Sequence, residues 1–159
     1  MKLLRFLFAV SIFCQSLLFA GSYSGKCVGV GDGDTILVMK YGRPIKIRLE
    51  GIDCPELGQD FGAKAKRFTA GMVFRKILEV REYYQDEYGR TVARVYIDSK
   101  DLSLELVKTG LAWIFRKGSD PILDRAVDQA RKQKLGLWSR PNPVPPWEYR
   151  RRHGRQWSQ

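Results

Sequence analysis

Histidine is nearly absent from this chain, which contains one among its 159 residues. That residue, His153, lies in an arginine-rich run near the C-terminus, with no second histidine or cysteine close to it in the sequence. Histidine is a frequent general base in enzymes and a common ligand of zinc. We therefore expect neither histidine-based acid–base catalysis nor a histidine zinc site in the folded domain.

Cysteine is also scarce, with three residues in the chain. Cys14 falls in an N-terminal segment that we expect to be removed, which leaves Cys27 and Cys54. These two could form a disulfide in an oxidising compartment, but the sequence does not fix whether their Cα atoms lie within bridging distance. We expect Cys27 to be a buried free thiol on a strand and Cys54 to lie in a loop.

Acidic residues are outnumbered, because 17 Asp and Glu face 28 Lys and Arg, which gives a net charge of +11. A chain this basic attracts polyanions, either nucleic acid or an anionic membrane. With 44% hydrophobic residues it can bury a core, which excludes an intrinsically disordered chain. The chain contains no internal repeat, and we expect one domain over residues 21–139 that acts as a monomer.

Residues 1–20 have the pattern of a secretory signal peptide. Lys2 and Arg5 precede an apolar run, and small residues follow at Ala20 and Gly21. The run has about fifteen residues, fewer than the roughly 20 that cross a bilayer as a helix. An uncleaved membrane anchor is the alternative. We expect cleavage, a secreted or periplasmic product, and no stable membrane association afterwards.

The apolar pattern of the remaining chain predicts mainly strands. Runs at 26–30 and 35–39 flank an Asp-Gly turn, and residues 45–50 alternate between apolar and polar. A second strand pair is expected at 77–84 and 91–97. Helices are expected at 61–72, 102–109 and 121–135. We expect an α+β fold that is mainly a β-barrel: a five-stranded Greek-key barrel of the oligonucleotide-binding (OB) type with about three helices.

Residues 140–159 form a Pro-rich basic tail. Four prolines fall between 141 and 146, and four arginines follow between 150 and 155. This composition predicts an extended, proline-stiffened arm with a basic end. A solvated tail and an additional arm that contacts phosphates both fit the pattern.

Three short segments concentrate charged residues: Asp32–Thr35, Arg48–Glu56 and Tyr88–Arg90. Each segment alone is explained by an ordinary turn or loop. Together they place carboxylates and guanidinium groups at the ends of neighbouring predicted strands. Asp34 and Asp53 would repel each other there, and a cation would offset that repulsion.

The residue types in these segments suit the hydrolysis of a phosphodiester. Two aspartates, a backbone carbonyl such as that of Cys54, and waters would suit Ca²⁺, which prefers oxygen ligands. Arg48 and Arg90 offer planar groups that bind phosphate oxygens in a bidentate manner. Glu56, which is not needed as a metal ligand, could take a proton from the attacking water.

Six motifs occur in order along the chain: Asp32-Gly33-Asp34-Thr35, Arg48-Leu49, Ile52-Asp53-Cys54-Pro55-Glu56, Asp86-Glu87-Tyr88-Gly89-Arg90, Gly110-Leu111-Ala112 and Leu135-Gly136-Leu137-Trp138-Ser139. In these motifs the chain resembles the staphylococcal nuclease (thermonuclease) family. The resemblance implies an OB barrel and a secreted, Ca²⁺-dependent endonuclease that cleaves DNA and RNA and leaves 3′-phosphate ends. It implies Asp34 and Asp53 as metal ligands, Arg48 and Arg90 as phosphate ligands, and Glu56 as the catalytic carboxylate.

The chain departs from the family's familiar pattern at Cys54 and in the stretch that contains Trp113 and Phe115. Cys54 stands where a threonine is familiar, which a ligand that acts through its main-chain carbonyl should tolerate. Trp113 and Phe115 lie in a stretch where the best-known member has tyrosines, and we expect these two aromatic residues to belong to the core. Tyr88 is retained and offers a face on which a base can stack.

The alternative function is a non-catalytic OB-fold protein that binds nucleic acid. Such a binder has no use for three carboxylates beside a phosphate site, because they repel the ligand. A protein of the membrane surface would need a long basic amphipathic helix, which the sequence does not contain. The sequence therefore favours a nuclease, and the resemblance implies DNA and RNA as its substrates.

Overall fold

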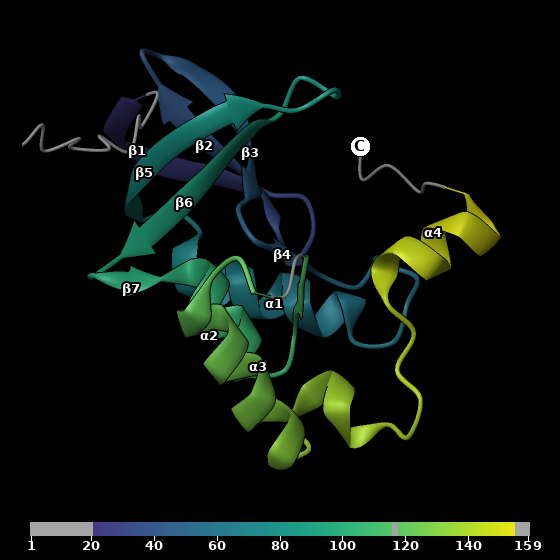
Figure 1. Cartoon of the computed structure of the whole chain (residues 1–159). Helices are drawn as coiled ribbons and strands as arrows, with labels where there is room; N and C mark the ends of the chain where they lie inside the picture. Colours follow the sequence, from purple (N-terminus) through teal and green to yellow (C-terminus); the bar gives the residue numbers. More distant parts are fainter. Residues whose placement is uncertain (1–20, 116–117, 155–159) are drawn as a thin grey trace, which may run out of the picture.

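Five long strands form a closed barrel in the computed structural model, which describes residues 21–115 and 118–154 (Figure 1). The strand order is β3-β2-β1-β5-β6 with antiparallel neighbours, and a parallel pairing of β3 with β6 closes the barrel. The predicted α+β fold with a five-stranded barrel is confirmed. The barrel strands are β1 (Gly21–Val30), β2 (Thr35–Lys40), β3 (Arg43–Leu49), β5 (Ile77–Gln85) and β6 (Thr91–Ile97).

Three additional strands have only two residues each. β4 (Ile52–Asp53) pairs with β8 (Trp113–Ile114), and β7 (Lys100–Asp101) extends the sheet beside β6. The sequence pattern did not predict these strands, because two residues are too few to show an alternation. The β4–β8 pair matters for the site, because it fixes the backbone at Asp53.

The helices cover one end of the barrel (Figure 1). α2 packs against both α3 and the barrel strand β6, and α1 contacts α2 and β1. Predicted helices near 61–72, 102–109 and 121–135 are present, with the third ending at Lys132 rather than at Gly136. The helices are α1 (Gly62–Val73), α2 (Leu102–Lys108), α3 (Pro121–Lys132), the 3₁₀-helix η1 (Gly136–Ser139) and α4 (Pro146–His153).

The last part of the described chain is not extended as predicted. Residues 146–153 form α4, which begins at Pro146, a residue whose fixed φ suits the first turn of a helix. The proline cluster therefore limits the extended segment to the residues before Pro146. The predicted signal peptide, residues 1–20, lies outside the described residues.

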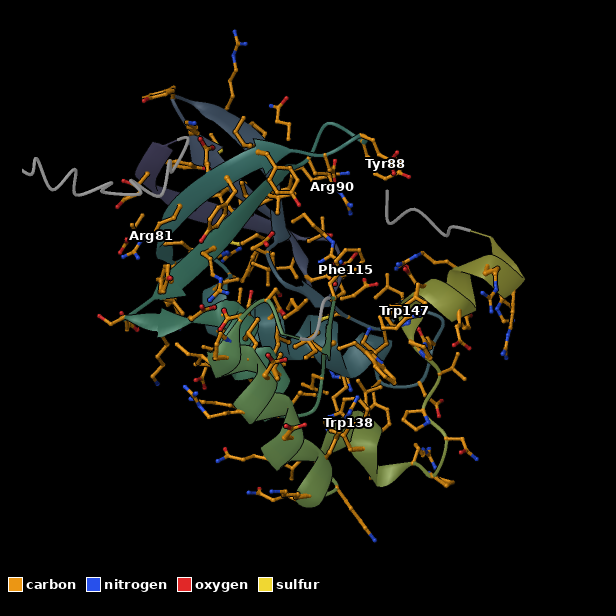
Figure 2. The ribbon with its side chains drawn as sticks, in the orientation of Figure 1. Arg81, Tyr88, Arg90, Phe115, Trp138 and Trp147 are labelled. Carbon is orange, nitrogen blue, oxygen red and sulfur yellow. The ribbon has the colours of Figure 1, made fainter. Side chains whose placement is uncertain are left out.

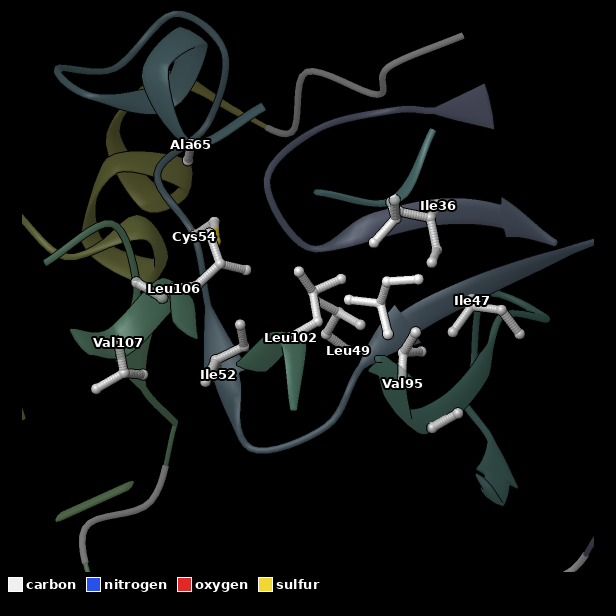
Figure 3. Packing of buried hydrophobic residues seen from close by; sticks show 14 of the residues in the cluster. Ile36, Ile47, Leu49, Ile52, Cys54, Ala65, Val95, Leu102, Leu106 and Val107 are labelled. Carbon is white, nitrogen blue, oxygen red and sulfur yellow. The ribbon is translucent and has the colours of Figure 1, made fainter. Parts of the chain in front are cut away.

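The core fills the space between the barrel and the helices (Figure 3). Alternate residues of β2 and β3, such as Ile36 and Ile47, are fully buried and pack with Leu102 and Leu106 of α2. Cys27 and Cys54 are both buried and both free, so the two thiols are not joined. The expected burial of Cys27 on a strand is confirmed, and Cys54 lies in a buried loop.

One arginine connects the barrel to the starts of two helices. Asp101 and Asp120 cap α2 and α3 by accepting hydrogen bonds from main-chain N–H groups, and both also form ion pairs with Arg94 of β6. The two ion pairs of Arg94 hold α2 and α3 against β6, the strand that closes the barrel.

Across residues 21–115 and 118–154, no helix is both apolar enough and long enough to cross a membrane.

Candidate active site

Asp34 lies at the end of the tight loop between β1 and β2. The Asp32 side chain accepts a hydrogen bond of 3.0 Å from the Asp34 N–H, which is a local turn that aspartate favours. The Asp34 carbonyl accepts a bond of 2.9 Å from the Leu49 N–H, so the loop is also tied to β3. The Asp34 side chain points inward and accepts a bond from the Cys54 N–H at 2.5 Å. The loop therefore brings Asp34 beside the segment that carries Asp53.

Arg48 joins the two aspartates that the sequence predicted to lie together. Its Nη1 lies 3.1 Å from Asp34 Oδ2, and its Nη2 lies 2.8 Å from Asp53 Oδ1. β3 carries Arg48 opposite Thr35 of β2, and β4 positions Asp53. Residues from three separate segments thus converge on one guanidinium group.

Burial sets the electrostatics of this cluster. Removal from water raises the pKa of Asp34 to about 6, although the charge of Arg48 opposes the rise. Burial likewise raises the pKa of Asp53, and hydrogen bonds from Arg150 and the charge of Arg48 oppose that rise. Burial also raises the pKa of the Cys54 thiol well above its ordinary value, which keeps the sulfur protonated. Asp34 and Asp53 are therefore two buried carboxylates held next to each other. Arg48 and Arg150 offset only part of the effect of burial on their pKa values.

Arg90 and Tyr88 lie on the turn between β5 and β6, which also carries Asp86. The Asp86 carboxylate accepts from the N–H groups of Tyr88 and Arg90 and pairs with the Arg90 guanidinium at 2.7 Å. Gly89 has a φ of 71°, the left-handed conformation that glycine supplies in turns. The turn holds Arg90 and Tyr88 side by side at the rim of the barrel (Figure 2).

A cleft of about 380 Å³ lies between the segment from Arg48 to Asp53 and the β5–β6 turn, and neither Asp34 nor Glu56 lines it. Arg48 and Asp53 line it from the barrel end, and Tyr88 and Arg90 line it from the β5–β6 turn. Phe115 also lines the cleft and is 57% exposed, so its expected place in the core is wrong (Figure 2). Trp113 packs edge-on against Trp138 with ring centroids 4.6 Å apart, as a residue of a packed aromatic cluster.

Arg150 connects Glu56 to the cluster, and the sequence did not indicate Arg150 as part of the site. Arg150 of α4 lies 2.7 Å from Glu56 Oε1 and 2.8 Å from Asp53 Oδ2. It also lines the cleft. The structure therefore places all three predicted carboxylates around Arg48 and Arg150. The only signal in the sequence was the basic run after the prolines, in which nothing distinguishes Arg150 from the neighbouring arginines.

The donor atoms at Asp34 and Asp53 fit a hard divalent cation. In the described ranges 21–115 and 118–154, no group of three or more His, Cys, Asp or Glu side chains could hold a metal ion. The two aspartates supply carboxylate oxygens, and backbone oxygen and water would have to complete the coordination, which Ca²⁺ accepts. The protonated Cys54 thiol is no ligand for such an ion, so Cys54 could contribute only through its main chain.

The loop that carries Asp34 has no room for a side chain at Gly33. A Cβ atom there would lie 2.7 Å from the Cys54 Cβ and 2.8 Å from the Ala65 Cβ. We expect Gly33→Ala to lower the free energy of unfolding by about 1–3 kcal/mol, because a packed site must then shift. Urea unfolding measures this loss. Gly71→Ala is the control, since a Cβ at Gly71 meets nothing within 4 Å, and an equal loss in both variants would contradict the steric argument.

Comparison with known proteins gives one family. The family model of staphylococcal nuclease homologues matches residues 46–140. A protein described as an uncharacterized endonuclease of Escherichia coli is 37% identical over 152 residues, covering 94% of this chain and 95% of that protein. A micrococcal nuclease of Shigella flexneri is 36% identical over 160 residues, covering 93% and 92%.

The shared region also extends to plants. A staphylococcal-like nuclease of Arabidopsis thaliana is 37% identical over 121 residues, which cover 74% of this chain and 36% of that protein. The family match, the two full-length bacterial relatives and the barrel with its acid- and arginine-lined cleft agree. This chain belongs to the staphylococcal nuclease family and is a phosphodiester hydrolase.

Proposed function

We propose that this chain is an exported, Ca²⁺-dependent endonuclease that hydrolyses DNA and RNA and leaves 3′-phosphate ends. The observation that carries the proposal is the convergence of Asp34 and Asp53 on Arg48, and of Asp53 and Glu56 on Arg150, beside the cleft that Arg90 lines. A protein that only binds nucleic acid gains nothing from three carboxylates at this position. Relatives named as nucleases support the same activity.

Asp34 and Asp53 are the proposed ligands of Ca²⁺, with the main-chain carbonyl of Cys54 as a third. When bound, Ca²⁺ would supply positive charge that stabilises the negative charge gathering on the phosphoryl oxygens. The fixed loop at Asp34 and the β4–β8 pairing at Asp53 support this role, because they hold the carboxylates in place before substrate binds.

Arg90 is proposed to bind the phosphate and to strengthen its contacts as the transition state forms. Its planar guanidinium can donate two hydrogen bonds to phosphate oxygens, and its turn holds it at the cleft. Arg48 is proposed to share this role from the opposite wall. Tyr88, next to Arg90 on the same turn, offers a ring on which a base can stack.

Glu56 is proposed as the general base. It would accept a proton from the water that attacks phosphorus, and the bond from phosphorus to the 5′ oxygen would then break. The 5′ oxygen takes up a proton from solvent water and leaves as a hydroxyl, while the phosphate, now bonded to the oxygen of the attacking water, stays on the 3′ side. The position of Glu56 at the edge of the buried aspartates, with a partly exposed side chain, supports access to water.

The proposed export depends on residues 1–20 as a cleaved signal peptide, which would deliver a monomer to the periplasm or the medium. N-terminal sequencing of the exported product tests this step. A product that begins near Gly21 is expected, and an intact N-terminus on membrane-bound protein would contradict it.

The activity itself is tested with purified residues 21–159, supercoiled plasmid and a structured RNA. We expect cleavage of both substrates with Ca²⁺ and its loss, reversed by added Ca²⁺, when a chelator is present. End-labelled products should carry 3′-phosphate. Plasmid that is bound in a gel-shift assay but left intact under all conditions would favour the non-catalytic binder instead.

A further inference from the structure

We propose that Arg150 is an internal competitor of the divalent cation: the C-terminal arm, defined as residues 140–154, places its guanidinium group on the carboxylates that the cation and the attacking water need. The inference rests on the proposed function, because it assigns the cation to Asp34 and Asp53. It adds a residue that controls whether the site can be loaded.

The contacts of Arg150 are specific. Its Nη2 donates to Asp53 Oδ2 at 2.8 Å, and its Nη1 donates to Glu56 Oε1 at 2.7 Å and to Asp53 Oδ1 at 3.3 Å. One planar group thus binds a proposed metal ligand and the proposed general base together. Hydrogen bonds between charged partners in this geometry are among the stronger ones in proteins.

Arg48 and Arg150 together contact both carboxylate oxygens of Asp53. Oδ1 accepts from Arg48 at 2.8 Å and from Arg150 at 3.3 Å, and Oδ2 accepts from Arg150 at 2.8 Å. The Asp53 side chain is only 3% exposed, so the two guanidinium groups occupy most of the space from which a ligand could approach it. A cation at Asp53 must therefore stand beside two positive charges or displace one of them. Arg48 pairs with both Asp34 and Asp53, whereas Arg150 enters from the arm and is the group that can leave.

The arm contacts the domain at the loop after Glu56 and at Trp113, and Arg140 pairs with Asp60 at 3.6 Å. The Tyr149 hydroxyl donates to the Gly58 carbonyl at 3.2 Å, and Gln59 donates to the Val144 carbonyl. Trp147 packs edge-on against Trp113 with centroids 5.6 Å apart and remains 39% exposed. α4 lies on the same side of the molecule as the tip of the β5–β6 turn (Figure 1), and Arg150 of this helix lines the cleft. An element attached in this way can withdraw without opening the barrel core.

Neighbouring arginines on the same helix do not share this placement. Arg151 is exposed, and Arg152 is exposed and forms a pair of 3.5 Å with Glu148 of the same helix. The general positive charge of the arm therefore differs from the specific contact of Arg150. This difference provides a matched control, because Arg151→Ala removes the same charge from the same helix.

The test is the affinity for Ca²⁺, measured by isothermal titration calorimetry on residues 21–159 of the wild type, Arg150→Ala and Arg151→Ala. We expect Arg150→Ala to bind Ca²⁺ at least about tenfold more tightly, because no charged hydrogen bond has to break first. Arg151→Ala should match the wild type to within about twofold, since an exposed charge acts weakly. Arg150→Ala should also show a larger rise in Tm when Ca²⁺ is added, because tighter binding stabilises the folded state more.

The outcomes separate this inference from the proposed function. Equal or weaker binding by Arg150→Ala, with normal circular dichroism, would overturn the competitor role and leave the Ca²⁺-dependent nuclease intact. No Ca²⁺ binding in any of the three proteins would overturn both. If Arg150→Ala does not fold, Arg150→Lys replaces it, because one ammonium group cannot make both contacts and should give an intermediate gain in affinity; no gain would overturn the role.

Discussion

Glu56→Gln is expected to lower kcat by about 10²- to 10⁴-fold, the contribution of a positioned general base. The amide cannot take the proton from water, but its oxygen can still accept a hydrogen bond from Arg150. The side chain keeps its size, so folding and substrate binding should change little. Single-turnover cleavage of a labelled oligonucleotide measures the chemical step apart from product release.

Glu105→Gln is the control for this variant. Glu105 forms a comparable pair of 2.9 Å with Lys108, but it does so on α2, and its loss should leave the cleavage rate unchanged. Activity of Glu56→Gln near the wild-type level would show that another group accepts the proton. A fall in kcat accompanied by a rise in KM of similar size and by an altered circular dichroism spectrum would instead point to a structural role for Glu56.

Arg90→Lys is expected to lower kcat/KM by about 10²- to 10³-fold, as removal of a preorganised donor to a developing charge does in other enzymes. The lysine keeps the positive charge but cannot donate two hydrogen bonds in a fixed plane. The Arg90–Asp86 pair lies on a partly exposed turn, so the free energy of unfolding should change by no more than about 1 kcal/mol. Steady-state cleavage and urea unfolding give the two quantities.

Arg81→Lys provides the matched comparison for Arg90. Arg81 also pairs with a carboxylate at 2.7 Å and also lies over a tyrosine ring, but it is on β5 away from the cleft (Figure 2). Its replacement should leave kcat/KM within about twofold of the wild type, as expected for an exposed pair. A loss in Arg81→Lys as large as that in Arg90→Lys would mean that general charge, rather than a placed guanidinium, drives catalysis.

The barrel and much of the cluster could be predicted from the sequence because their signals are local. Alternation at 45–50 and the Asp-Gly turn before Thr35 identify strands whose ends must be neighbours. Those ends carry Asp34 and Arg48, so their proximity follows from the strand pairing. The start of the helix predicted from residue 121 was equally readable, since Asp120 followed by Pro121 is a clear start pattern, and Asp120 caps α3 in the structure.

Other features could not be predicted because they depend on contacts between distant segments. Arg150 pairs with Asp53, which lies 97 positions earlier in the chain, and with Glu56, which lies 94 positions earlier. No local sequence pattern encodes contacts over such a separation. Phe115 was expected in the core because aromatic residues usually are buried, but its place after the short β8 strand turns it to the cleft. The 3₁₀-helix η1 and the helix α4 were not predicted, because the glycine and prolines after residue 135 are residue types that often mark the end of a helix.

Arg150 of α4 lines the cleft, whereas β1 begins on the side of the barrel away from α4 (Figure 1), so the two ends of the described chain are not equivalent places for attaching a fusion partner. An affinity tag or reporter joined after the last helix would stand next to the opening through which a polymer must enter. A tag joined ahead of the first strand would stand clear of it. Proteins prepared for assays or crystallisation should therefore carry the added sequence at the amino end.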